Sequence, residues 1–333
     1  MPRHTGPAEN EQRPGSRDLR VLGQLFGFLR PYAPVVIAAA LALLAYVNAW
    51  PDVLVFDDRE FLAGDRFDAL TAGDFVRFFS QSLWEAGANA AALYRPLLLV
   101  SLGLENLVFG DWYAGYHLAN ILRHALAVLL VFGFLRSVLR ATGLAEPQWF
   151  ALGATAVFAV HPVLSDAVAS VFNSSDIYVA IFVVGGLWYL LVNHRERPVR
   201  AWGVTGLCYF VALLYKESAA AMPALAVVVL WLTSSEGWLR RVRLVAPAVL
   251  LVIPLAAYLG LRAEALEEFD SLAAQFSLVP TAYAAEPESA QQAAKPGPTP
   301  APPLSRFRLN FEPARAGTAV SMWFDGLRLM AFP

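Results

Sequence analysis

The sequence has few charged residues and almost no cysteine. Aspartate, glutamate, lysine and arginine make up 16% of its 333 residues, and 57% of the residues are hydrophobic. A soluble domain has about 25% charged and about 45–50% apolar residues, so this composition indicates an integral membrane protein. The formal net charge of -2 gives no basic face for a nucleic acid. Cys208 has no second cysteine to pair with, which excludes a disulfide within the chain.

The N-terminal segment lacks the features of a secretory leader. The first twenty residues are polar and contain neither a short apolar core nor a small-residue cleavage site. We therefore expect the first apolar run to be retained as a membrane anchor. Residues 1–31 are expected to form a cytoplasmic tail with a short interfacial helix at 19–29.

Long apolar runs follow each other along the rest of the chain. A helix needs about 20 mostly apolar residues to cross the bilayer. Lipid offers no hydrogen-bond partners to backbone N–H and C=O groups, so a spanning segment must pair them within a helix. The sequence therefore predicts an all-α polytopic membrane protein. The run 96–109 is short and contains Glu105, and we interpret it as interfacial or re-entrant. The expected spans are 32–50, 115–135, 149–164, 176–193, 201–215, 218–232, 244–262 and one that begins near 317.

Clusters of arginine fix the orientation of these spans. Cytoplasmic loops collect lysine and arginine, and all the clusters fall on one side when 96–109 is not counted as a crossing. The clusters are Arg17, Arg20 and Arg30; Arg136 and Arg140; Arg195, Arg197 and Arg200; and Arg240, Arg241 and Arg243. The chain then divides into four parts, which are the tail 1–31, a transmembrane core 32–262, a long Ala- and Pro-rich outer loop 263–316 and the start of a further span at 317–333. The first outer loop of the core, 51–95, is expected to carry interfacial helices. We expect this chain to be a fragment of a longer protein.

Ionisable residues gather at the outer ends of the predicted spans. Charges beside a bilayer are costly, which makes these residues functional candidates. Asp57 and Asp58 directly follow the first span and are the predicted catalytic pair, with Asp57 as a base that takes a proton from an acceptor hydroxyl and Asp58 as its orienting neighbour. The predicted substrate ligands are Arg95, His161, Asp166, Asp176, Lys216 and Glu217, and the cations among them could hold the charge of a substrate phosphate.

Plainer interpretations stay open for each of these residues. The two aspartates are also typical of a helix N-terminus, where carboxylates favour the dipole. Lys216 and Glu217 could pair with each other in a turn. Arg123, inside a span, could hold helices together or reach a lipid phosphate, and we favour packing. No ligand spacing demands a metal; the candidate ligands of a divalent metal are Asp57, Asp58 and His161.

Several motifs, in their order, resemble the transmembrane and tetratricopeptide-repeat O-mannosyltransferases, which are type C membrane glycosyltransferases. The resemblance covers roughly residues 33–262, with a looser similarity at 306–333. Arg123 and the stretch 173–175 depart from the family pattern, and the repeats are absent from this sequence. The motifs are Val55-Phe56-Asp57-Asp58-Arg59-Glu60-Phe61, Tyr94-Arg95-Pro96-Leu97, Tyr116-His117-Leu118-Ala119-Asn120 with His124, His161-Pro162-Val163 with Asp166-Ala167-Val168-Ala169, Asp176, and Leu214-Tyr215-Lys216-Glu217.

The resemblance implies a type C glycosyltransferase bundle that carries out O-mannosylation or a similar reaction. It implies inverting transfer of a hexose, mannose-like, from a polyprenyl-phosphate donor to a protein serine or threonine hydroxyl or to a glycan. The partners would be the lipid-linked donor, the protein or glycan acceptor and membrane lipids. The site would face the non-cytoplasmic side of a membrane, expected to be the bacterial inner membrane. Two other functions stay open: a transporter or flippase that uses the outer carboxylates as a proton or cation relay, and a non-catalytic assembly subunit.

Overall fold

The computed structural model describes residues 32–49, 54, 57–62, 65–67, 69–84 and 93–277. The predicted tail at 1–31, the Ala- and Pro-rich loop beyond residue 277 and the predicted last span at 317–333 lie outside the described residues.

Every regular element in the described part of the chain is helical, which confirms the prediction of an all-α membrane protein. Short 3-10 turns at Asp65–Phe67, Pro162–Leu164, Phe172–Ser174, Glu217–Ala221 and Ala246–Leu251 lie between the helices. The helices are α2 (Ala33–Ala45), α3 (Asp57–Leu62), α4 (Ala72–Arg77), α5 (Pro96–Phe109), α6 (Tyr113–Ala141), α7 (Pro147–Ala159), α8 (Ser165–Ala169), α9 (Ser175–Asn193), α10 (Pro198–Tyr215), α11 (Met222–Thr233), α12 (Trp238–Val245) and α13 (Val252–Ser277).

Four helical segments in the described residues are long and apolar enough to cross a membrane: Tyr113–Ala141, Phe172–Asn193, Pro198–Tyr215 and Trp238–Leu266. The pair Pro147–Ala159 and Pro162–Ala169, bent by 51°, makes a fifth if it is counted as one span. The helices α2 and α5 and the segment Glu217–Thr233 are apolar but shorter. These lengths and compositions are those of an integral membrane protein.

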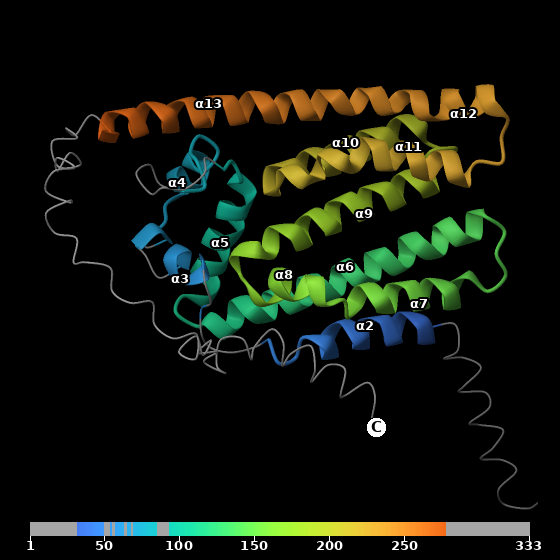
Figure 1. The fold of residues 1–333 in the computed structure, drawn as a ribbon, viewed down its shortest axis with the longest axis horizontal. Helices are drawn as coiled ribbons and strands as arrows, with labels where there is room; N and C mark the ends of the chain where they lie inside the picture. Colours follow the sequence, from blue (N-terminus) through green and yellow to red (C-terminus); the bar gives the residue numbers. More distant parts are fainter. Residues whose placement is uncertain are drawn as a thin grey trace, which may run out of the picture.

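The long helices run alternately in opposite directions and lie side by side as a bundle (Figure 1). As a result, the end of α2, the start of α6, the end of α7, the start of α9 and the end of α10 all lie at one end of the bundle, together with α3, α4 and α5 (Figure 1). We call this the α3 end. Helix α9 packs against α6 and α10 at the centre.

The first outer loop packs onto the α3 end. The spacing of its aromatic residues predicts an amphipathic helix through Leu83, but α4 ends at Arg77 and the chain continues in turns. Phe78 and Leu83 are buried in the same core cluster as Leu98 and Leu99 of α5. These apolar side chains are covered by protein, so the loop forms a cap over the bundle end.

Candidate functional site

The two neighbouring aspartates have opposite environments. Helix α3 begins at Asp57, which is exposed, whereas Asp58 is fully buried. Consecutive residues on an α-helix point about 100° apart, so only one of the two can face the bundle. Asp57 therefore presents an exposed carboxylate at the surface of the described residues.

Asp58 is held by the loop between α8 and α9. Its Oδ1 accepts hydrogen bonds from Ser170 Oγ at 2.9 Å and from the backbone N–H of Phe172 at 2.8 Å, and its Oδ2 accepts one from the backbone N–H of Val171 at 2.9 Å. Burial raises the pKa of the Asp58 carboxyl, although these three hydrogen bonds and the charge of His117 each lower it. Asp58 thus ties α3 to a loop that lies far away in the sequence.

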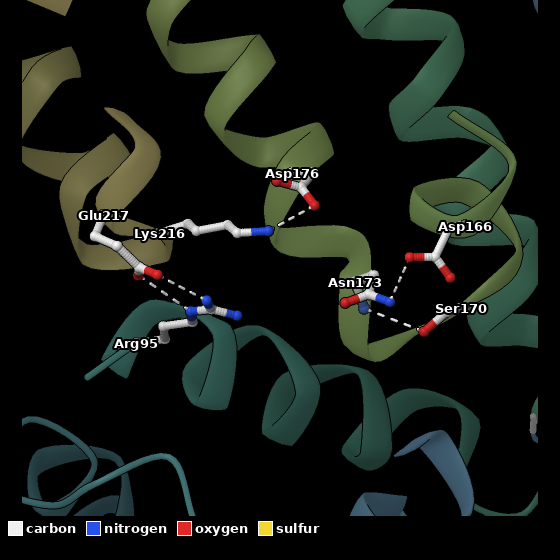
Figure 2. Close-up of polar contacts among 7 residues, drawn as sticks. All are labelled: Arg95, Asp166, Ser170, Asn173, Asp176, Lys216 and Glu217. Atoms are coloured by element: carbon white, nitrogen blue, oxygen red, sulfur yellow. Dashed lines mark hydrogen bonds and ion pairs between the residues drawn. The ribbon is translucent and has the colours of Figure 1, made fainter. Parts of the chain in front are cut away.

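Two ion pairs share one turn at the α3 end of the bundle. Arg95, directly before α5, donates to Glu217 from Nη2 at 3.0 Å and from Nε at 3.4 Å. Lys216 Nζ donates to Asp176 Oδ2, in the first turn of α9, at 2.8 Å. Figure 2 shows Lys216 extended toward Asp176 while Glu217 faces Arg95. The pairs therefore join α5, α9 and the end of α10.

The four charged side chains differ in their access to solvent. The Arg95 side chain is 8% exposed and that of Lys216 is 22% exposed, whereas both carboxylate partners are 42% exposed. Burial raises the pKa of Glu217, but the hydrogen bonds from Arg95 and from its own backbone amide, with the charges of Arg95 and Lys216, outweigh it and leave the pKa lowered. Glu217 is therefore ionised at neutral pH, and Lys216 is the more accessible cation.

His161 and Asp166 lie on the exposed surface of the segment that follows α7. His161 Nδ1 accepts a hydrogen bond from the backbone N–H of Val163 at 3.2 Å and so caps the turn that begins at Pro162. Asp166 Oδ2 accepts from Asn173 Nδ2 at 2.9 Å, and the Asn173 backbone N–H donates to Ser170 Oγ (Figure 2). Asp166 is thus connected to the loop that holds Asp58.

The candidate ligands of a divalent metal are Asp57, Asp58 and His161. Within the part of the chain that the structure describes, no group of three or more His, Cys, Asp or Glu side chains is arranged to hold a metal ion. Both oxygens of Asp58 already accept hydrogen bonds, and His161 Nδ1 caps its own turn.

Two residues that contribute to this geometry were not among the predicted site residues. Ser170 contacts Asp58 directly, and Asn120 of α6 donates to the backbone oxygens of Val168 and Ser170. Asn120 could have been found as a polar residue within an apolar span. Ser170 has no such signal, because a serine in a loop is common.

Part of this chain is similar in sequence to protein O-mannosyl-transferases. No family model matches the chain. The chain is 32% identical over 188 residues to protein O-mannosyl-transferase Tmtc1 of Drosophila melanogaster, which covers 54% of this chain and 21% of that protein. It is 31% identical over 194 residues to protein O-mannosyl-transferase Tmtc2 of Drosophila melanogaster, with 54% and 20% covered, and 27% identical over 203 residues to protein O-mannosyl-transferase TMTC2 of Homo sapiens, with 58% and 23% covered.

The chain spans about a fifth of the length of these curated relatives. The similar part covers more than half of this chain. The resemblance to the O-mannosyltransferases that the motifs predicted is thereby confirmed over that part of the chain.

Proposed function

We propose that the chain is a membrane glycosyltransferase that moves a hexose, mannose-like, from a polyprenyl phosphate to a hydroxyl acceptor on the non-cytoplasmic face. The observation that supports the proposal is the placement of the exposed carboxylate of Asp57 at the same bundle end as the ion pairs of Arg95 and Lys216, in a chain similar to protein O-mannosyl-transferases. A base and cations are the groups that such a transfer requires.

Asp57 is the base in this mechanism. Its carboxylate takes the proton of the acceptor hydroxyl as the acceptor oxygen attacks the anomeric carbon of the donor sugar. The bond between that carbon and the phosphate oxygen breaks, and the phosphate leaves with the electron pair. Because attack and departure occur on opposite faces of the carbon, the anomeric configuration inverts. Asp58 keeps α3, and with it Asp57, against the bundle.

Lys216 is the cation that meets the donor phosphate. Its side chain is more exposed than that of Arg95, and its partner Asp176 is partly open to solvent. A phosphate can therefore approach the ammonium group and compete with the Asp176 carboxylate for it. Arg95 holds the carboxylate of Glu217, the residue next to Lys216, by a hydrogen bond.

The exposed polar groups at the same end are assigned to the sugar. Asp166 and Asp176 can accept hydrogen bonds from sugar hydroxyls, and His161 presents an imidazole on the surface. The acceptor is a hydroxyl of a protein serine or threonine, by analogy with the similar protein O-mannosyl-transferases, or a glycan hydroxyl.

The test is sugar transfer from a synthetic polyprenyl-phosphate mannose by membranes that contain the full-length protein. Asp57→Asn should lower the rate by about 10²–10⁴-fold, which is the usual contribution of a general base. Asp111→Asn is the matched control, because Asp111 is an exposed acid in the turn directly before α6 (Tyr113–Ala141), and α6 begins at the α3 end. Product analysis by NMR should show the inverted anomer.

Either of two results would count against the proposal. If wild type transfers mannose and Asp57→Asn keeps the wild-type rate, another group is the base. If wild type transfers no sugar from mannose, glucose or galactose donors, a transporter or assembly role is favoured instead, and the next assay is lipid or proton flux.

The orientation in the membrane is tested separately with single cysteines. Asp111→Cys and Arg140→Cys, each in a Cys208→Ser background, place a thiol at exposed positions at opposite ends of α6 (Tyr113–Ala141). A membrane-impermeant maleimide should label the first in intact cells and the second only after the membrane is opened. The reverse pattern would put the α3 end in the cytoplasm.

A further inference from the structure

A buried ion pair joins α5 and α6 inside the bundle. Arg123 of α6 donates to Glu105 Oε1 of α5, and both side chains are only 12% exposed. The guanidinium carbon also lies 5.0 Å from the ring centroid of Tyr178 of α9. Replacing a buried ion pair by apolar residues is often neutral or stabilising. Stability alone therefore does not explain why two charges lie in an apolar helical bundle.

The second partner of Arg123 indicates what the pair does. Arg123 Nη1 also donates to Oδ1 of Asn120, one turn earlier on the same helix, and Asn120 is fully buried. With the amide oxygen held by Arg123, the amide nitrogen must point the other way. It donates to the backbone oxygens of Ser170 at 2.9 Å and Val168 at 3.3 Å.

The loop that Asn120 holds is the loop that holds Asp58. Its Ser170 hydroxyl and the backbone amides of Val171 and Phe172 all donate to the Asp58 carboxylate. A continuous set of hydrogen bonds thus runs from the buried ion pair, through one amide side chain and one loop, to the residue next to the exposed Asp57.

We propose that Arg123, held by Glu105, is a positioning residue for the Asp57 carboxylate. It orients Asn120, Asn120 fixes the loop 168–172, and the loop fixes α3. An arginine suits this task because its planar fork presents several donors in fixed directions, so one side chain can serve two acceptors at once. The role in catalysis rests on the proposed transferase function, whereas the role in ordering the loop does not.

The test removes both charges together. In Glu105→Leu/Arg123→Leu no unpaired charge is left in the core, whereas Arg123→Leu alone would strand the Glu105 carboxylate. The control is Arg136→Leu, which removes an exposed arginine from the far part of the same helix. Wild type, the double variant and the control are compared in the full-length protein by steady-state transfer of mannose and by amide hydrogen exchange.

The double variant should lower kcat by about 100-fold, the cost of a small misplacement of a catalytic group, and leave the KM for the donor unchanged. The amides of Val171 and Phe172 should exchange faster than in wild type, while the control matches wild type in both measurements. Asn120→Leu, which leaves the ion pair intact, should reproduce both effects, because the proposal requires Asn120 between Arg123 and the loop. Wild-type kcat and exchange in Asn120→Leu would therefore overturn the inference even if the double variant does not fold.

Wild-type kcat and wild-type exchange at residues 168–172 in the double variant would overturn the inference. A loss that appears in KM with kcat unchanged would also overturn it, because positioning of a base acts on the chemical step. If wild type itself transfers no sugar, the proposed function fails, but the exchange experiment still decides whether Arg123 orders the loop.

Discussion

Replacing Asp58 by alanine should destabilise the protein, whereas the same change at Asp57 should not. Asp58 is fully buried and accepts three hydrogen bonds from the loop between α8 and α9, whereas Asp57 is exposed. The two residues are adjacent in sequence and identical in chemistry. Any difference between the two variants must therefore come from the environment that the fold gives each carboxylate.

The magnitude follows from the donors that Asp58→Ala leaves without an acceptor. These are the Ser170 hydroxyl and the backbone amides of Val171 and Phe172. A buried donor left unsatisfied costs about 1–3 kcal/mol, so three of them give at most about 9 kcal/mol. Since a serine hydroxyl can rotate and water can enter the vacated space, we expect a loss of about 3–6 kcal/mol in the free energy of unfolding.

Asp58→Asn should cost less than Asp58→Ala. An asparagine with its oxygen at the Oδ1 position keeps the bonds from Ser170 and Phe172. Its NH2 group would then face the backbone N–H of Val171, where two donors oppose each other. One bond is lost instead of three, which corresponds to about 1–3 kcal/mol.

Thermal unfolding in detergent measures these differences. Cys208, the only cysteine of this sequence, lies partly buried in α10, so a thiol-reactive dye reports the opening of the helical core. The midpoint temperature of unfolding should equal the wild-type value for Asp57→Ala. It should be lower for Asp58→Asn and lowest for Asp58→Ala. Equal midpoints for the alanine variants of Asp57 and Asp58 would refute the reasoning, because they would mean that the loop does not depend on the buried carboxylate.

Two further predictions concern packing and pH. A Cβ on Gly133 would lie 2.5 Å from the Trp188 ring, so Gly133→Ala should cost about 1–3 kcal/mol, whereas Gly153→Ala, with nothing within 4 Å, should be neutral or slightly stabilising by the same dye assay. The pKa of Glu217 is lower in the folded state than its unfolded-state value near 4.5. The ion pair of Glu217 with Arg95 therefore stabilises the fold fully above about pH 4.5, and this stabilisation is lost as the pH falls through the folded-state pKa. Glu217→Gln should therefore flatten the decline of the unfolding midpoint below about pH 4.5, and an unchanged decline would assign it to other carboxylates.

The long helices could be predicted from apolar run length because lipid leaves the backbone no other choice. The predicted spans 115–135, 176–193 and 201–215 correspond to α6, α9 and α10. Run length does not predict where a helix ends outside the apolar region. Helix α13 continues from the predicted end at residue 262 to Ser277, because the following residues are rich in alanine, glutamate and leucine, which favour helix without regard to the bilayer.

The partners within the candidate site could not be predicted from sequence neighbours. Lys216 and Glu217 are adjacent, yet each pairs with a residue of another helix, Asp176 and Arg95. The reason is local: Lys216 has an extended backbone, with φ -163° and ψ 140°, and consecutive side chains on an extended backbone point in opposite directions. The interpretation of a self-paired turn is therefore wrong, and the turn instead connects two ion pairs.

The fold buries Asp58 and leaves Asp57 exposed, although nothing in the sequence distinguishes the two aspartates. The donors that surround Asp58 come from residues 170–172, and the asparagine that holds those residues comes from α6. A loop serine and two backbone amides carry no sequence signal, and the asparagine, although it is a polar residue within an apolar span, does not show which loop it holds. Only when α3 packs against the loop does one carboxylate lose its water and the other keep it. The buried acid then stabilises the contact between α3 and the loop while the exposed acid contributes little to stability, and this difference in stability is what the paired alanine variants measure.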